Sequence, residues 1–328
     1  MTLEKWEIIR GVSKLVHTCA AVKKGERVLI VTDTNFPHHI PDLFALMVTA
    51  LGAEPVLARM LPRQHNGSEP PLVVAEAMKH ADVIFELTTV FVHQSKARQE
   101  AHRAGARYLY LGCITEELLG KPGAMDADFE AIAPGVERIA GLISRSSEIQ
   151  ITAPGGTNFR ASTRGRDGRA LTGIARSPGS FGAPPDIEAG VIPVEGTGEG
   201  TIVADAYAVE IGLLSNPIRL EVQKGEVKTI EGAGQDAENL KRLLHSIGDP
   251  KVYQIAEIGI GFNPEARMID NILSAEGKAG TAHIAIGSTP GDKDAQLVRA
   301  GIHLDLVFWR PSILLDGNLV LKDGEIVL

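Results

Sequence analysis

The sequence predicts an α/β fold: an N-terminal βαβ domain with a parallel sheet, followed by a mainly antiparallel β (α+β) domain. Two observations predict it. Apolar runs of strand length alternate with amphipathic helical segments up to about residue 145. Beyond that point, short alternating apolar runs separated by glycine and proline replace them. We therefore expect an α/β domain at 1–145 and a β-rich domain at 146–328.

Composition excludes several functional classes. A chain of 328 residues with 44% hydrophobic and 23% charged residues is typical of a globular protein of one large or two medium domains. The formal net charge of -8, without a long basic run, argues against nucleic-acid binding. We see neither a signal peptide nor an apolar run of membrane-spanning length. Two distant cysteines form no disulfide framework. We expect a soluble cytoplasmic protein without a membrane partner.

The elements of the first domain follow from periodicity. Apolar residues near helical spacing predict a helix over 3–24, which Gly25 ends, and the continuous apolar run at 26–33 is typical of a buried parallel strand. The same criteria predict further helices and strands along this half of the chain. The helices are at 41–52, 73–79 and 95–104, and the strands are at 55–58, 81–87 and 107–111.

Two strand-to-helix loops, 33–41 and 88–95, lie where ligands usually bind in such a sheet. The first has no G-x-G-x-x-G motif, which argues against a dinucleotide site. It carries His38, and the second loop carries His93. Either these histidines line a substrate cleft or they are solvated loop residues, and we keep both as candidate substrate-binding residues.

The second domain reads as strands and hairpins with one helix. Strands are expected at 147–152, 158–162 and 200–206 and a helix at 237–246. Glycine at turn positions predicts a hairpin over 217–232. The same chemistry predicts a second one, in which strands 313–321 and 326–328 flank a turn at 322–325.

Isolated ionisable residues interrupt the later apolar runs, against the usual cost of burying charge. His303 and Asp305 are two apart in one such run, so an extended strand directs both side chains to the same face. Glu257 and His283 occupy two further runs, and Glu188 follows a Pro/Gly-rich loop. Singly, each could be an ordinary hydrogen-bonded residue. Together, carboxylates and imidazoles are the ligands that divalent cations prefer, and they predict a metal site.

Four segments that carry these residues resemble the aminopeptidase T and aminopeptidase S type of metallopeptidase, in the same order. They are 186–200, 256–259, 280–287 and 302–305. The resemblance implies one or two divalent ions (Zn, Co or Mn) that activate a water molecule for peptide hydrolysis. The implied ligands are Glu188, Glu257, His283, His303 and Asp305, with Glu257 as a metal-bridging or catalytic carboxylate. It also implies a homodimer or larger homo-oligomer. The family has a tyrosine seven residues after the first histidine, where this chain has Pro290.

Other segments resemble 2,5-dihydroxypyridine 5,6-dioxygenase, a branch on the same scaffold. They are 199–201, 220–225, 249–255, 258–261 and 264–267. This resemblance implies a single Fe(II) held by two histidines and one aspartate. His303 and Asp305 match two of these ligands, and the remaining histidine aligns with Glu257. His283 and Glu188 have no counterpart there.

The additional glutamates favour two ions, so we expect a metal-dependent hydrolase that cleaves an amide or small peptide-like substrate. In that reaction Glu257 would move protons and Arg310 would line the cleft. The alternatives are the Fe(II) ring-cleaving dioxygenase and a non-catalytic small-molecule-binding protein. A mixed outcome, with one metal held by Glu257, both histidines and Asp305, also stays open.

Overall fold

The computed structural model describes residues 5–290 and 298–327, which form two compact units. Among these residues, the first unit comprises 5–130 and 172–185. The second comprises 131–171, 186–290 and 298–327. Residues 172–185 thus belong to the first unit, although they lie in the glycine-rich second half of the sequence.

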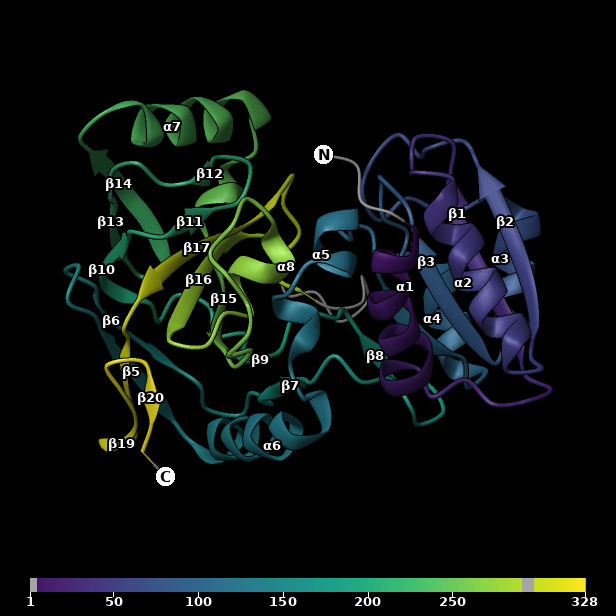
Figure 1. Ribbon diagram of the computed structural model, residues 1–328. Helices are drawn as coiled ribbons and strands as arrows, with labels where there is room; N and C mark the ends of the chain where they lie inside the picture. The colour runs from purple at the N-terminus through teal and green to yellow at the C-terminus, as the bar shows by residue number, and fades with distance from the viewer. Residues whose placement is uncertain (1–4, 291–297, 328) are drawn as a thin grey trace. The chain divides into compact units, whose positions relative to one another are not determined.

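The first unit is built on a parallel sheet, sheet A, with strand order β2-β1-β3-β4-β8 (Figure 1). Its interior consists of apolar side chains such as Val31, Met78 and Ile84. The strands are β1 (Arg27–Asp33), β2 (Glu54–Met60), β3 (Val83–Leu87), β4 (Arg107–Tyr110) and β8 (Phe181–Gly182). The helices are α1 (Lys5–Lys14), continued by a π-helical turn at Leu15–Cys19, α2 (His39–Ala50), α3 (Leu72–Lys79), α4 (Lys96–Arg103) and α5 (Glu116–Gly120), followed by a 3-10 turn at Ala124–Asp126.

The second unit contains two antiparallel sheets. Sheet B has the order β14-β13-β10-β6-β5-β18-β19-β20, and sheet C has the order β12-β11-β17-β16-β15-β9-β7. The strands of sheet B are β5 (Glu148–Thr152), β6 (Asn158–Ser162), β10 (Glu199–Ala204), β13 (Ile218–Gln223), β14 (Glu226–Gly232), β18 (Ser312–Leu315), β19 (Asn318–Lys322) and β20 (Glu325–Ile326). Those of sheet C are β7 (Arg169–Leu171), β9 (Glu188–Val191), β11 (Tyr207–Ala208), β12 (Gly212–Leu213), β15 (Ile255–Gly261), β16 (Thr281–Gly287) and β17 (His303–Trp309).

The two sheets of this unit lie as successive layers, with sheet C in front of sheet B in Figure 1. Apolar side chains alternate along the strands of sheet C, so that Ile258, Ile284 and Leu306 are fully buried on one face. Three helices complete the unit: α6 (Phe129–Arg145), which begins at the end of the first unit, α7 (Gln235–Ile247) and α8 (Ile272–Ala275). A 3-10 turn at Pro250–Tyr253 leads into β15.

The predicted fold class is confirmed, with differences in detail. The helix expected over 3–24 changes to a π-helical turn at Leu15 and ends at Cys19. The strand expected over 313–321 is broken by a turn, because Asp316 and Gly317 both have positive φ (47° and 81°). That dipeptide is favoured in two-residue hairpin loops, and it divides the strand into β18 and β19.

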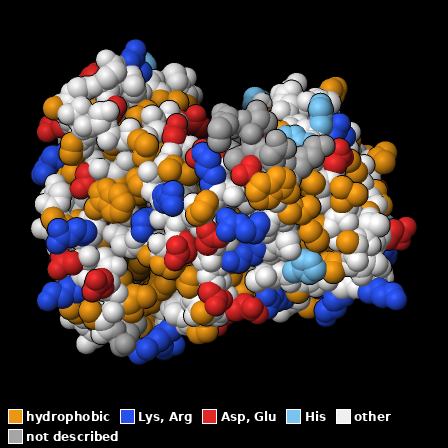
Figure 2. All heavy atoms as spheres, viewed as in Figure 1, with side chains coloured by type: hydrophobic (Ala, Val, Ile, Leu, Met, Phe, Trp, Pro, Cys, Tyr) orange, Lys and Arg blue, Asp and Glu red, His pale blue; other side chains and the backbone are white. Residues whose placement is uncertain are grey.

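Among the described residues, no helix is both long and apolar enough to cross a membrane. Figure 2 shows acidic and basic side chains intermixed over the face turned to the viewer, with hydrophobic side chains in groups between them. The described part of this face therefore carries no continuous basic surface.

Candidate metal centre

The strand register of sheet C brings the predicted metal ligands onto one face. Glu257 on β15 is opposite Ala285 on β16, which is opposite Asp305 on β17. His283 on β16 is opposite Gly259, two residues after Glu257. Residues opposite one another in a sheet share a face, as do residues two apart in one strand. The side chains of Glu257, His283, His303 and Asp305 therefore project together, on the face that Ile284 and Leu306 leave free.

A β-bulge gives Glu257 its orientation. Ile255 is opposite Ile286 on the apolar face, and the register then shifts so that Glu257 is opposite Ala285. Because Ala256 is the extra residue of the bulge, the side chains of Ile255 and Glu257 point to opposite faces of the sheet. Without the bulge, Glu257 would point into the apolar interior.

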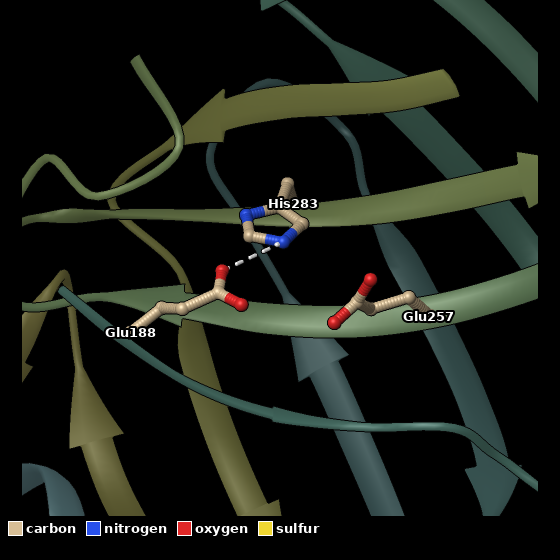
Figure 3. Close-up of side chains that lie close together, drawn as sticks. All are labelled: Glu188, Glu257 and His283. Atoms are coloured by element: carbon tan, nitrogen blue, oxygen red, sulfur yellow. Dashed lines mark ion pairs between the residues drawn. The ribbon is translucent and has the colours of Figure 1, made fainter. Parts of the chain in front are cut away.

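Small residues leave room for these side chains. The His283 ring lies over Gly259, because a Cβ atom there would overlap its imidazole atoms. Gly190 on β9 is opposite Gly259, and a Cβ there would lie 3.1 Å from Oε1 of Glu257. Figure 3 shows His283 above the strands, with the carboxylates of Glu188 and Glu257 turned toward it. The row of glycines thus forms the floor of the cluster.

The cluster consists of two sets of three possible ligands that share Glu257. In the first, Nε2 of His283 lies 3.2 Å from Oε2 of Glu188. In the second, Nε2 of His303 lies 3.2 Å from Oδ2 of Asp305 and 3.3 Å from Oε2 of Glu257. Within each set, the ligand atoms all lie within 4.8 Å of one another. We call these five residues the metal centre: Glu188, Glu257, His283, His303 and Asp305.

The donor set fits a divalent cation. Oε2 of Glu188 and Oδ1 of Asp305 are buried without a hydrogen bond and lie 3.2 and 3.8 Å from Nε2 of His283, an arrangement that a bound cation would satisfy. Nδ1 of His303 lies 2.6 Å from the carbonyl oxygen of Ser288. That bond orients the ring and leaves Nε2 for a metal, the usual arrangement of a histidine ligand. The His303 side chain is 28% exposed and the other four at most 7%, so the centre reaches solvent beside His303.

The electrostatics of the centre are dominated by burial and by mutual charge. Burial by itself would raise the pKa of Asp305, but the charge and hydrogen bond of His303 hold that pKa below its ordinary value. Conversely, burial would lower the pKa of His303, and Asp305 raises it above the ordinary value. Two further carboxyls, Asp186 and Glu276, have a strongly raised pKa because they are buried beside other acids. The crowding of acids thus disfavours their charged forms, and a bound cation would offset that repulsion.

Sequence reasoning missed three residues around the centre. Asp186 and Glu276 are electrostatically coupled to Asp305. Arg169, on β7, contacts Oε1 of Glu257 and lies 3.6 Å from Oε1 of Glu188. Asp186 lies only two residues before Glu188 and could have been noticed by that spacing. Nothing in the local sequence pairs the three-residue strand β7 with β9, so Arg169 had no such signal.

The three predicted substrate-binding residues do not belong to the metal centre. His38 is exposed and precedes α2, and Arg310 is exposed in the turn after β17. His93, in the first unit, stacks on Phe91 with ring centroids 4.3 Å apart, and its Nδ1 lies 3.6 Å from Oε2 of Glu86. Their part in substrate binding stays a prediction.

Known proteins resemble the chain over nearly its whole length. The sequence model of the family described as 2,5-dihydroxypyridine 5,6-dioxygenase matches residues 8–328. The enzyme of that name from Pseudomonas putida KT2440 is 23% identical over 266 residues, which cover 78% of this chain and 74% of the relative. The structure of 2,5-dihydroxypyridine dioxygenase from the same organism superposes with a TM-score of 0.84 at 19% identity, covering 99% of this chain and 98% of that one. AmpT from Thermus thermophilus gives a TM-score of 0.68 at 15% identity, covering 99% of this chain and 100% of that one.

These comparisons correct the predicted activity. The expected metal-dependent hydrolase is wrong, because the family match and the curated relative both indicate a dioxygenase. At this identity, the likeness to AmpT shows the shared fold alone. The ligand count behind that expectation was also incomplete, because it did not include Arg169. The prediction counted Glu188 and Glu257 as spare ligands for a second ion and left out the guanidinium that lies beside both.

Proposed function

The chain belongs to the 2,5-dihydroxypyridine 5,6-dioxygenase family, and from this we propose that it is a ferrous-iron-dependent, ring-cleaving dioxygenase of a dihydroxylated pyridine. The observation that carries the proposal is the family match over residues 8–328. It is supported by the metal centre, in which a histidine and an aspartate lie side by side on β17. Imidazole and carboxylate ligands with open positions are typical of non-haem iron oxygenases.

His303, Asp305 and Glu257 would hold the iron, with His283 beside Asp305 at 3.8 Å between Nε2 and Oδ1. Bound Fe(II) would supply the redox chemistry toward dioxygen and would polarise a ring hydroxyl. Glu257 directs one oxygen to Arg169 and the other to His303, so both contacts would fix this ligand in place beside the iron.

In the proposed reaction the C5–C6 bond breaks and each of these carbons gains one atom of the same O2 molecule. The electrons come from the ring, so no separate reductant is required. The lack of a dinucleotide-binding motif in the 33–41 loop agrees with this balance.

The test is oxygen uptake by protein purified without oxygen and loaded with ferrous iron. With 2,5-dihydroxypyridine we expect one O2 consumed per ring opened, together with loss of the absorbance of the aromatic ring. Asp305→Asn removes a charged ligand and should abolish uptake. Asp323→Asn changes an exposed turn residue with positive φ, where asparagine is tolerated, and should leave uptake unchanged. Iron-loaded wild-type protein that consumes no oxygen with this substrate contradicts the proposal.

A further inference from the structure

We propose that Arg169 is a positioning residue that occupies the second cation position of the metal centre, so that the centre takes one divalent ion. The inference rests on the proposed function only in assuming that the centre binds a divalent ion. It assigns a role to a residue outside the ligand set. It also explains how a chain with enough carboxylates for two ions can run a one-metal reaction.

The contacts of the two glutamates carry the inference. Glu257 turns Oε1 to the guanidinium of Arg169 and Oε2 to Nε2 of His303, at 3.3 Å. Glu188 divides its oxygens in the same way, with Oε1 3.6 Å from Arg169 and Oε2 3.2 Å from Nε2 of His283. Each carboxylate therefore gives one oxygen to Arg169. A second ion among Glu188, Glu257 and His283 would have to bind beside this guanidinium.

The backbone delivers the guanidinium to this place. Arg169 is opposite Gly190 in the β7–β9 pair, and Gly190 is opposite Gly259 on β15. A Cβ on Gly190 would lie 3.3 Å from the NH2 atom of Arg169, so the glycine leaves the path across the sheet open. Figure 3 shows the carboxylates of Glu188 and Glu257 both turned to the space beneath His283. Arg169 reaches that pair of carboxylates from the neighbouring strand.

The chemistry of arginine suits a fixed cation. A guanidinium stays protonated in proteins, whereas a histidine here could lose its charge when a metal approached. Ions of two-metal sites lie about 3.5–4 Å apart, so a second ion between the two glutamates would lie against a permanent positive charge. The set of Glu257 Oε2, His303 Nε2 and Asp305 Oδ2 does not use the oxygens that contact Arg169, and it remains free for one ion.

The test counts metal ions and needs neither substrate nor oxygen. Wild-type protein and variants are titrated anaerobically with Co(II), followed by the visible absorbance of the bound ion and by elemental analysis after gel filtration. We expect one equivalent of Co(II) to bind to wild type and two to Arg169→Met. If wild type binds a second ion weakly at high Co(II) concentration, the dissociation constant of that ion should be at least tenfold lower in Arg169→Met. Arg169→Lys keeps a positive charge and should stay at one. Arg166→Met removes a nearby arginine that pairs with Glu195, outside the metal centre, and should also stay at one.

Wild-type protein that binds two equivalents overturns the inference whatever the variants do. A folded Arg169→Met protein that binds only one also overturns it, with folding checked by circular dichroism. If Arg169→Met does not fold, Arg169→Gln, which keeps hydrogen-bond donors but no charge, is judged by the same count. If the dioxygenase proposal fails, the iron-loaded protein consumes no oxygen but the number of bound metal ions stays as expected. If the inference about Arg169 fails, the number of bound ions differs from the expected one.

Discussion

The imidazole of His283 lies directly over the backbone of Gly259, on the adjacent strand of sheet C, and occupies the space where a side chain at position 259 would begin. Gly259 donates no ligand atom. It nevertheless sets the position of one, because the ring cannot keep its place above any larger residue.

We therefore predict that Gly259→Ala weakens metal binding about 10- to 100-fold, the usual cost of disturbing a group that orients a ligand, because Nε2 of His283 lies 3.8 Å from Oδ1 of the candidate ligand Asp305. The added methyl must displace the His283 ring, because its carbon would overlap the imidazole atoms. The measurement is an anaerobic Co(II) or Fe(II) titration. Gly135→Ala, in helix α6, meets only an ordinary contact at 3.8 Å and should bind metal like wild type. Equal affinities for both variants would show that His283 is not held by this contact.

The buried thiol of Cys19 should make stability fall at alkaline pH. Burial raises the pKa of Cys19 from 9.0 to about 12. The folded state thus favours the protonated thiol, and this contribution is complete below pH 9 and is lost as the pH rises toward 12. Between pH 8 and pH 10, wild type should lose about 1 kcal/mol more unfolding free energy than Cys19→Ala.

Urea denaturation at the two pH values measures this difference. Val12→Ala also truncates a fully buried side chain of the same unit, but it removes no titrating group and should keep the wild-type pH slope. A Cys19→Ala protein with an unchanged slope would contradict the assignment.

Tyr108→Phe should destabilise the protein by about 1–3 kcal/mol, the cost of leaving a buried hydrogen-bonding group without a partner. The Tyr108 hydroxyl donates to Oε2 of the fully buried Glu86 at 2.7 Å, while Thr88 donates to Oε1 at 2.8 Å. Chemical denaturation checks the value. The same change at the partly exposed Tyr253 should cost little, and equal costs at both positions would count against the role of Glu86.

The sequence revealed residues of the centre wherever a charge broke an otherwise apolar strand. His283 and Asp305 belong to this class, because the two-residue period of a strand says which neighbours share their face. Arg169 could not be found in this way. Its partners are fixed by pairing between β7 and β9, two short strands far from β15 in the sequence, and no local pattern encodes such a register.

Helix α6 shows a second limit of local reasoning. It buries Phe129, Val136 and Ile143 at helical spacing, yet Pro134 and Gly135 lie in its interior and argue against a helix from propensity alone. Burial of the apolar side chains outweighs that penalty. The turn at Asp316 and Gly317 has a local signal in its Asp-Gly pair, although the strand expected over 313–321 ran through it.

The pairing of β5 with β18 bears on the order of assembly. The backbone amide of Ser147 bonds the carboxylate of Asp316, 169 positions later, and β18 joins the sheet beside β5. Contacts between such distant residues form slowly, because a long loop must first be closed. β17, with His303 and Asp305, immediately precedes β18. During synthesis, the first unit can therefore fold long before the metal ligands exist together, and loading of the ion becomes one of the last steps of maturation.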